Sequence, residues 1–325
     1  MSLPELTVYA PDRTEPSDLD AFWAATIEQG RRAATEPILT PVDAGPWVDA
    51  YDLTFSGFDG DPVRAWLLLP PDTGEPVGGV VRFAGYSGGR GEVRDHLALV
   101  STGLAVLAMD SRGQGWTSAG ATGDPHGTPG PAVPGLMTQG IAAAETLYLR
   151  RLFTDAVRAV DVLQAHPRTA AERVGVSGAS QGGGLALAAA ALADEVAAAV
   201  IDVPFLCHIR RAVRITDRRP YAEVREYLAL YRDRVEQVFA VLDHVDGMNL
   251  AARGRCPALF STALMDLTCP PSTVFAAHHH WAGPKQIAVY EFNDHEGGGP
   301  AQAARGREFL ARHLGGQAKA VHLGG

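Results

Sequence analysis

Between residues 80 and 313 the chain alternates short apolar runs with longer segments whose apolar residues recur at helical spacing. The apolar runs are residues 80–83, 104–109, 174–176, 197–201, 258–264 and 287–290. The segments expected to be helical are about 92–102, 152–165, 181–193, 272–281 and 301–313. Buried strands that alternate with crossover helices form a mainly parallel sheet with helices on both faces. The alternation therefore predicts an α/β protein built on one central sheet.

The first 70 residues follow a different pattern. Residues 19–32 carry apolar side chains at helical spacing behind Ser17 and Asp18, a pair suited to cap a helix. Two extended runs, 48–55 and 63–69, are separated by a turn rich in Gly and Asp. They predict a β-hairpin that gives the sheet an antiparallel edge.

Two later segments interrupt the alternation. Residues 221–250 form a charged helical stretch between two strands, where an insertion over the carboxyl edge of the sheet is expected. Residues 116–140 are rich in Gly and Pro. We expect residues 117–140 of this segment to form an ordered loop with a role in function or in contacts. We expect a single domain over residues 1–315, with a helical extension at 1–35 and a flexible tail at 316–325.

The composition excludes several classes of function. The 28 Lys and Arg residues against 37 Asp and Glu residues give a net charge of −9, which repels phosphate backbones and anionic membrane surfaces. Neither a nucleic acid nor a membrane is therefore expected as a partner.

The 3 cysteines have no C-x-x-C spacing, so neither a disulfide framework nor a zinc site is indicated. No secretory signal is visible and no apolar segment reaches the roughly 20 residues of a membrane-spanning helix. We expect a cytoplasmic protein without cofactor or metal.

A nucleophile motif stands between one predicted strand and the next helix. Residues 178–182, Gly-Ala-Ser-Gln-Gly, match G-x-S-x-G, the turn that lifts a serine above the sheet of a hydrolase. Residues 85–89, Gly-Tyr-Ser-Gly-Gly, match it as well. Ser180 is followed at once by a helical pattern, whereas Ser87 is followed by further glycines. Ser180 is therefore the predicted nucleophile.

A serine nucleophile needs a base, and the base needs an orienting carboxylate. In folds with this strand order those partners follow the serine at the ends of later strands. Asp266 and His295 lie at such positions and form the predicted pair. Asp202 also ends a strand and is the rival acid, although a satisfied polar contact is its expected role. Asp294 and Glu296 flank the candidate base; one interpretation makes both of them solvated loop charges, and the other gives Glu296 a role in positioning the loop.

The run His278-His279-His280 invites a metal interpretation. Adjacent histidines on a helix point in different directions, and no Cys or acidic partner has ligand spacing nearby. A helix face without a metal is therefore expected.

Stabilisation of an oxyanion calls for two backbone N–H donors. The first residue of the helix after the nucleophile, Gln181, supplies one candidate, and Tyr86 in the glycine-rich loop after the strand at 80–83 supplies the other. Arg112 and Gln114 follow the strand at 104–109 and are expected to have structural roles near the site, with Asp110 or Asp155 as the partner of Arg112.

Three of these motifs, taken together, indicate a resemblance to a known family. The chain carries Arg112-Gly113-Gln114, then the motif at 178–182, then His295-Glu296. In this respect it resembles the α/β-hydrolases of carbohydrate esterase family 7, which holds acetyl xylan esterases and cephalosporin-C deacetylases. The resemblance extends from about residue 9 to residue 314.

That resemblance implies a nucleophile at Ser180, an acid at Asp266, a base at His295 and oxyanion donors at Tyr86 and Gln181. It also implies metal-independent removal of acetyl groups from sugars and small alcohol esters, including antibiotic esters such as cephalosporin C. It further implies a ring-shaped homohexamer that encloses the active sites.

Two other classes of function stay open at this point. One is a related hydrolase with a different substrate, such as a thioesterase, a short-chain carboxylesterase or a peptidase. The other is a non-catalytic binding protein on the same scaffold, because a fold does not determine a function.

Overall fold

The computed structural model describes residues 1–72, 74–127 and 135–316, and the statements below concern those residues. Nine strands form a single sheet in the order β1-β2-β3-β5-β4-β6-β7-β8-β9. The strands are β1 (Ile38–Val42), β2 (Asp49–Ser56), β3 (Pro62–Leu69), β4 (Val77–Phe83), β5 (Ala105–Met109), β6 (Thr169–Ala179), β7 (Ala199–Asp202), β8 (Ala258–Ala263) and β9 (Lys285–Tyr290). From β5 through β9 neighbouring strands are parallel, while β1, β2 and β3 are antiparallel. The predicted mainly parallel sheet with an antiparallel N-terminal edge is confirmed.

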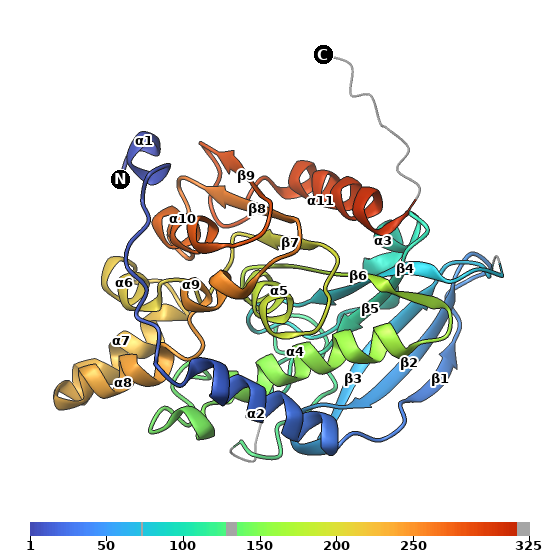
Figure 1. Ribbon diagram of the computed structural model, residues 1–325, viewed down its shortest axis with the longest axis horizontal. Helices are drawn as coiled ribbons and strands as arrows, with labels where there is room; N and C mark the ends of the chain where they lie inside the picture. Colours follow the sequence, from blue (N-terminus) through green and yellow to red (C-terminus); the bar gives the residue numbers. More distant parts are fainter. Residues whose placement is uncertain (73, 128–134, 317–325) are drawn as a thin grey trace.

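Helices cover both faces of the sheet (Figure 1). On one face lie α2 (Leu19–Arg32), α4 (Tyr148–Ala165), α5 (Gln181–Leu192) and α10 (Pro271–His280). On the other lie α3 (Leu97–Val100) and α11 (Gly299–Leu314). Each layer has its own cluster of buried apolar side chains, and the alternation of side chains along the central strands feeds both. Short 3-10 helices complete the described elements: η1 (Phe58–Gly60), η2 (Val93–His96), η3 (Ala144–Thr146), η4 (Arg232–Arg234) and η5 (Ala251–Arg253).

Several elements differ from the sequence prediction; β6, for example, covers Thr169–Ala179, whereas only 174–176 were predicted as strand. Strand β1 was not predicted, because it contains Pro41 and most of its side chains are exposed at the sheet edge.

The helix expected over 92–102 is instead the 3-10 helix η2 followed by the single turn of α3. Asp95 Oδ2 accepts a hydrogen bond from the Glu92 N–H at 2.9 Å, and His96 Nε2 lies 2.9 Å from the Arg90 carbonyl oxygen. These contacts tie the segment back to the preceding loop and tighten its first turn. Helix α4 also begins earlier than predicted, at Tyr148.

The insertion between β7 and β8 contains four short helices, the first three of which lie together at one end of the molecule, while the fourth packs against α5 and α10 (Figure 1). They are α6 (Ile209–Ile215), α7 (Tyr221–Leu230), α8 (Val235–Leu242) and α9 (Gly247–Leu250). The predicted insertion at 221–250 is therefore helical, and it begins earlier, at α6. Of the loop predicted at 116–140, residues 128–134 lie outside the described residues, as do residues 317–325 of the predicted tail.

The N-terminal extension, with the short helix α1 (Leu3–Leu6), runs across α10 and the insertion. His279 Nδ1 lies 2.8 Å from the Tyr9 carbonyl oxygen, and His280 Nε2 lies 2.7 Å from that of Pro11. His278 is half-buried, and burial lowers its pKa to about 4. Two of the three adjacent histidines therefore hold the extension in place, which fits the structural interpretation of this run.

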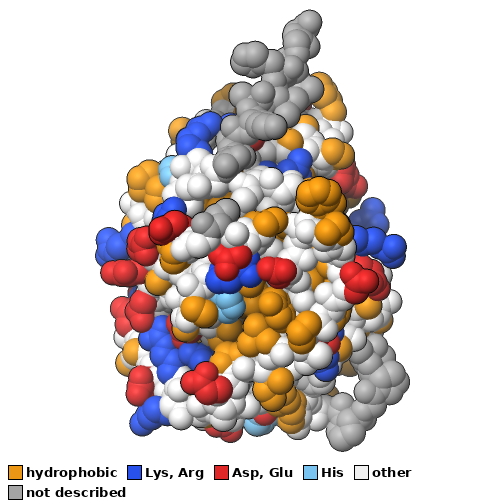
Figure 2. Space-filling view, turned by 90° about the vertical axis from the view of Figure 1, so that its right-hand side faces the viewer, with side chains coloured by type: hydrophobic (Ala, Val, Ile, Leu, Met, Phe, Trp, Pro, Cys, Tyr) orange, Lys and Arg blue, Asp and Glu red, His pale blue; other side chains and the backbone are white. Residues whose placement is uncertain are grey.

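An apolar groove lies between the antiparallel strands and the C-terminal end of α4. Leu39, Leu53, Leu67 and Val162 are among the side chains that line it. Figure 2 looks onto this side of the molecule and shows hydrophobic side chains gathered near the centre, with charged side chains around them. Ser180 is not among the residues that line this groove, so the groove and the candidate site are different features of the surface. Within the described residues, no helix combines the length and apolar character needed to cross a membrane.

Candidate active site

Ser180 stands in the turn that joins β6 to α5, as the sequence predicts. Its backbone has φ 58° and ψ −121°, a conformation that non-glycine residues rarely adopt. A Cβ at Gly178 would lie 2.3 Å from the backbone of Gly182, and a Cβ at Gly182 would lie 2.3 Å from the Phe83 carbonyl oxygen. The two glycines of the motif are therefore required because strand, turn and helix approach one another too closely for a side chain.

Ser180, His295 and Asp266 form a continuous chain of hydrogen bonds. His295 Nε2 lies 2.9 Å from Ser180 Oγ, and His295 Nδ1 lies 2.9 Å from Asp266 Oδ2. The loop after β8 carries Asp266, and the loop after β9 carries His295. A carboxylate only accepts, so Nδ1 donates to Asp266 and Nε2 is left to accept the hydroxyl proton of Ser180. This tautomer suits the imidazole to act as a general base toward Ser180.

The Asp266 side chain is itself held in place. It is 1% exposed, and its Oδ1 accepts hydrogen bonds from the backbone N–H groups of Thr268 at 2.7 Å and Cys269 at 2.8 Å. Both oxygens of this buried carboxylate are therefore satisfied, one by the backbone and one by His295. Such partners offset the cost of burying a charge and fix the carboxylate in one orientation.

One predicted oxyanion donor directly follows the serine, and the other follows the strand next to that of the serine. Gln181 is the first residue of α5, where backbone N–H groups have no partner within the helix and the helix dipole favours negative charge. Tyr86 follows β4, the strand next to β6. Neither backbone N–H donates a hydrogen bond to another of the described residues. Both remain available to an oxygen of a ligand.

Gln114 connects these two segments. Its Oε1 accepts a hydrogen bond from the backbone N–H of Ser87 at 2.6 Å. Its Nε2 donates to Gln181 Oε1 at 2.8 Å and to the Tyr148 hydroxyl at 2.9 Å. The side chain thus lies between the glycine-rich loop and the start of α5.

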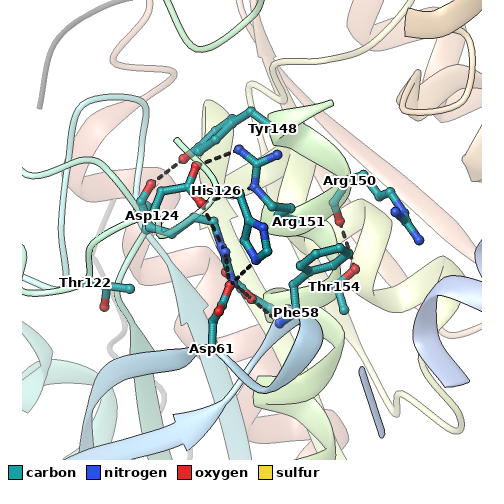
Figure 3. A network of polar contacts seen from close by, with 12 residues as sticks. Phe58, Asp61, Thr122, Asp124, His126, Tyr148, Arg150, Arg151 and Thr154 are labelled. Atoms are coloured by element: carbon teal, nitrogen blue, oxygen red, sulfur yellow. Dashed lines mark hydrogen bonds and ion pairs between the residues drawn. The ribbon is translucent and has the colours of Figure 1, made fainter. Parts of the chain in front are cut away.

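Arg112 is completely buried and is surrounded by carboxylates. Its Nε and Nη2 donate to Asp155 at 2.6 and 2.7 Å, and its Nη1 lies 2.9 Å from Asp61 and 3.2 Å from Asp124. Figure 3 shows Asp61 and Asp124 gathered in this network with Arg151 and His126. Of the two partners considered from the sequence, Asp155 is the one that Arg112 contacts. The network holds the loop after β5 against α4, and it keeps Gln114 in place through the same loop.

The rival acid Asp202 has other partners. Its Oδ1 accepts hydrogen bonds from Ser261 Oγ at 2.9 Å and from Gln302 Nε2 at 2.7 Å. Burial raises the pKa of Asp202 to about 6, and these two donors only partly offset that effect. Asp202 also supports the nucleophile, because its carbonyl oxygen accepts a hydrogen bond from the Ser180 N–H at 3.0 Å.

Ser87 and Glu296 have contacts that support the loops in which they lie. Ser87 Oγ lies 2.7 Å from Thr117 Oγ1 and has no histidine as a partner among the described residues. Glu296 Oε1 accepts a hydrogen bond from Asn293 Nδ2 at 2.6 Å, and its Oε2 accepts one from the Asp294 N–H at 3.1 Å. Glu296 therefore braces the loop that carries His295.

Ser180 and His295 border an open cleft with a volume of about 480 Å³. Arg82, Asp202 and Arg307 line the same cleft. It can admit a small ester, and its charged walls are of both signs.

One cluster near the site has the donor atoms of a metal centre. Ligand atoms of Asp266, Cys269 and His295 lie within 4.8 Å of one another. Both ring nitrogens of His295 are already engaged with Asp266 and Ser180. A cation bound through either nitrogen would displace the hydrogen bond which that nitrogen makes, so we assign no metal to this cluster.

The sequence of the chain matches the model of the acetyl xylan esterase (AXE1) family over residues 1–313. The chain belongs to this family. It thereby joins a family of carboxylic ester hydrolases, in agreement with the resemblance carried by the three motifs.

Two solved structures of acetyl xylan esterases resemble the chain over nearly their whole length. That of Paenibacillus sp. R4 is 36% identical with a TM-score of 0.90, and the match covers 97% of this chain and 100% of that one. Acetyl xylan esterase 1 of Thermoanaerobacterium sp. JW/SL YS485 is 32% identical with a TM-score of 0.88, over 96% of this chain and 98% of that one. These structures establish the α/β-hydrolase fold.

More distant relatives differ in length. The acetyl esterase Axe7A of Xylanibacter ruminicola is 26% identical over 294 residues, which cover 88% of this chain and 64% of that protein. The chain thus spans somewhat less than two-thirds of that curated relative. An acylaminoacyl peptidase of Pyrococcus horikoshii, 16% identical with a TM-score of 0.61, matches 83% of this chain and 42% of its own, and shares the fold alone.

Proposed function

We propose that this member of the acetyl xylan esterase family is a serine esterase that removes acetyl groups from acetylated sugars. The observation that carries the proposal is the hydrogen-bonded chain from Asp266 through His295 to Ser180. Membership of the family and the cleft beside Ser180 support it as well.

In the proposed first half-reaction, His295 Nε2 takes the proton of Ser180 as Oγ attacks the carbonyl carbon of the acetyl ester. The backbone N–H groups of Gln181 and Tyr86 stabilise the negative charge on the carbonyl oxygen. Asp266 keeps the imidazole in the required tautomer and stabilises the imidazolium. The tetrahedral intermediate then expels the alcohol, which leaves with the proton from His295, and an acetyl group stays on Ser180.

The second half-reaction repeats these steps with water. His295 Nε2 takes a proton from the water as its oxygen attacks the acetyl carbonyl carbon. The new intermediate expels Ser180 Oγ, which takes the proton back from His295, and acetate is released. No group other than these side chains and backbone donors is needed to balance the steps.

Acetylated xylo-oligosaccharides and cephalosporin C are the substrates we propose to test first, because both types of acetyl ester fit the family. A series of p-nitrophenyl esters from acetyl to octanoyl, at a constant leaving group, is the decisive measurement. A steep fall in kcat/KM beyond the shortest acyl chains would support a deacetylase. Faster turnover of long acyl chains or of acyl-CoA would favour another esterase or a thioesterase of the same fold.

A different measurement distinguishes an esterase from a non-catalytic binding protein on the same scaffold. A fluorophosphonate probe should label the wild-type protein and should not label the Ser180→Ala variant. Absence of labelling and of hydrolysis in the wild-type protein would overturn the proposal. The homohexameric ring and the cytoplasmic location stay predictions, and light scattering after size-exclusion chromatography tests the first of them.

A further inference from the structure

A buried carboxylate of the insertion lies against the side chain of a predicted oxyanion donor. Glu223 belongs to α7 and is only 4% exposed. The Tyr86 hydroxyl donates to Glu223, with distances of 2.8 Å to Oε1 and 3.0 Å to Oε2. Tyr86 and Glu223 lie far apart in the sequence and belong to different elements, so only the tertiary fold brings them together.

A third segment meets the same pair. The backbone N–H of Met137 donates to Glu223 Oε2 at 3.1 Å. The Tyr86 hydroxyl oxygen accepts hydrogen bonds from the backbone N–H groups of Leu136 at 3.2 Å and Gly135 at 3.4 Å. The carboxylate and the phenol therefore join three stretches of chain: the glycine-rich loop after β4, the loop before α4 and the helical insertion.

The Tyr86 ring is also enclosed by aromatic side chains. It meets Trp116 edge-on at a centroid distance of 5.8 Å, and it meets Phe205 at 6.3 Å. Burial, followed by the neighbouring Glu223 carboxylate, raises the pKa of the Tyr86 hydroxyl, which therefore stays a donor at neutral pH. A hydrogen bond to a charged acceptor in such surroundings is among the stronger ones in proteins.

We propose that Glu223 is a positioning residue for ester hydrolysis, which holds Tyr86 so that its backbone N–H faces the developing oxyanion. The inference rests on the proposed function, because it assigns Tyr86 as one of the two oxyanion donors. The residue that follows supports it: Ser87 has φ 73°, and its N–H is bound by Gln114 Oε1 at 2.6 Å. The peptide groups around Tyr86 are therefore held by Gln114 on one side and, through the side chain, by Glu223 on the other.

This arrangement matters for rate because an oxyanion donor acts only when it is already aligned. A donor that must rotate into place in the transition state loses most of its effect. Loss of one aligned donor lowers kcat by about 10²- to 10³-fold in serine hydrolases. Loosening a donor without removing it should cost less, on the order of 10-fold or more in kcat. The KM for a small ester should change little, because the ground-state carbonyl depends weakly on this donor.

The same helix offers a matched control. Glu226 lies one turn further along α7, is exposed, and pairs with Arg219 Nη2 at 2.8 Å. Arg219 also approaches Glu223, with Nη1 3.8 Å from Oε1. Glu226→Gln therefore changes the charge of the helix and its contact with Arg219 without touching Tyr86.

The experiment compares Glu223→Ala, Glu223→Gln, Tyr86→Phe and Glu226→Gln with the wild-type protein on p-nitrophenyl acetate. We expect kcat to fall at least about 10-fold in Glu223→Ala and Tyr86→Phe, with KM within about 3-fold of wild type. Glu223→Gln should fall in between, because its amide oxygen can still accept the Tyr86 proton while one acceptor for Met137 is lost. Glu226→Gln should keep the wild-type kcat. The double variant Tyr86→Phe/Glu223→Gln should lose no more than the worse single variant, because both act through one contact.

A merely structural role gives a different result. It predicts a lower melting temperature with an unchanged kcat per folded, fluorophosphonate-reactive site, and that outcome in Glu223→Gln and Tyr86→Phe overturns the inference even where Glu223→Ala does not fold. Strictly additive losses in the double variant would overturn it as well. If the wild-type protein neither reacts with the probe nor hydrolyses the ester, the proposed function fails; an active wild-type protein with unaffected variants refutes only the positioning role.

Discussion

Asp266 Oδ2 lies 2.9 Å from His295 Nδ1, although these residues follow two different strands. The parallel strands β8 and β9 are neighbours in the sheet, so their carboxyl ends deliver the two side chains to one edge. Asp202, at the end of the adjacent β7, is turned instead toward Ser261 and Gln302. Two strand ends thus offer a carboxylate, and the contacts of each decide its role.

The two carboxylates give a direct test of the acid. Asp266→Asn should lower kcat by about 10³- to 10⁴-fold, because an amide in place of the carboxylate favours the wrong tautomer of His295. Asp202→Asn should stay within about 5-fold of wild type, since its contacts are to Ser261 and Gln302. Steady-state kinetics on p-nitrophenyl acetate measure both. A larger loss in Asp202→Asn than in Asp266→Asn would exchange the two roles.

The two serine motifs give a second test. Ser180→Ala should lower hydrolysis of p-nitrophenyl acetate by at least about 10³-fold, because it removes the nucleophile. Ser87→Ala should retain measurable activity, since its hydroxyl contacts Thr117 and no base. Complete loss in the Ser87 variant, with labelling by a fluorophosphonate still present on Ser180→Ala, would move the nucleophile.

The raised pKa of Asp202 predicts how stability depends on pH. Its pKa is about 6 in the folded protein because of burial, against an ordinary value of 3.8 for an aspartate side chain. The folded state therefore binds the Asp202 proton more tightly than the unfolded state does. The stabilisation that this proton gives the folded state is fully present below about pH 4 and is lost as the pH rises through about 6. Asp202→Asn removes that loss.

We therefore expect the free energy of unfolding of Asp202→Asn, relative to wild type, to rise by up to about 3 kcal/mol between pH 4 and pH 7. Urea unfolding at a series of pH values measures the difference. A difference that stays constant over this range would show that the ionised Asp202 is not penalised in the folded protein.

The close approach of β4, β6 and α5 predicts a strict need for glycine at position 182. In Gly182→Ala the new Cβ would stand 2.3 Å from the Phe83 carbonyl oxygen, so the backbone must move. We expect a loss of about 2 kcal/mol or more in the free energy of unfolding, together with a large loss of kcat. Gly123→Ala is the control, because a Cβ there meets nothing within 4 Å. Equal stability of the two variants in thermal unfolding would contradict the steric argument.

Most of the order of strands and helices could be predicted from the sequence, because local patterns determine it. The apolar runs that became β4 to β9 are short and bounded by turns, and the helices between them show apolar residues at helical spacing. Strand β1 escaped prediction, since its exposed side chains and Pro41 lack that signal. The same local rules place Ser180 at a sharp turn between a strand and a helix.

The contacts of the site depend on the tertiary structure. A strand end identifies both Asp202 and Asp266 as candidates, and the chain alone does not say which of them faces His295. Glu223 has no local signal, since it is one acidic residue among several in a charged helical stretch, and Tyr86 reaches it only after the insertion folds over the sheet. The sequence by itself determined the elements, their order and the turn at Ser180, because neighbouring residues dictate backbone conformation. The packing of loops from distant strands decided which carboxylate meets His295 and which one holds Tyr86, because side-chain partners are set by distances that exist only in the folded chain.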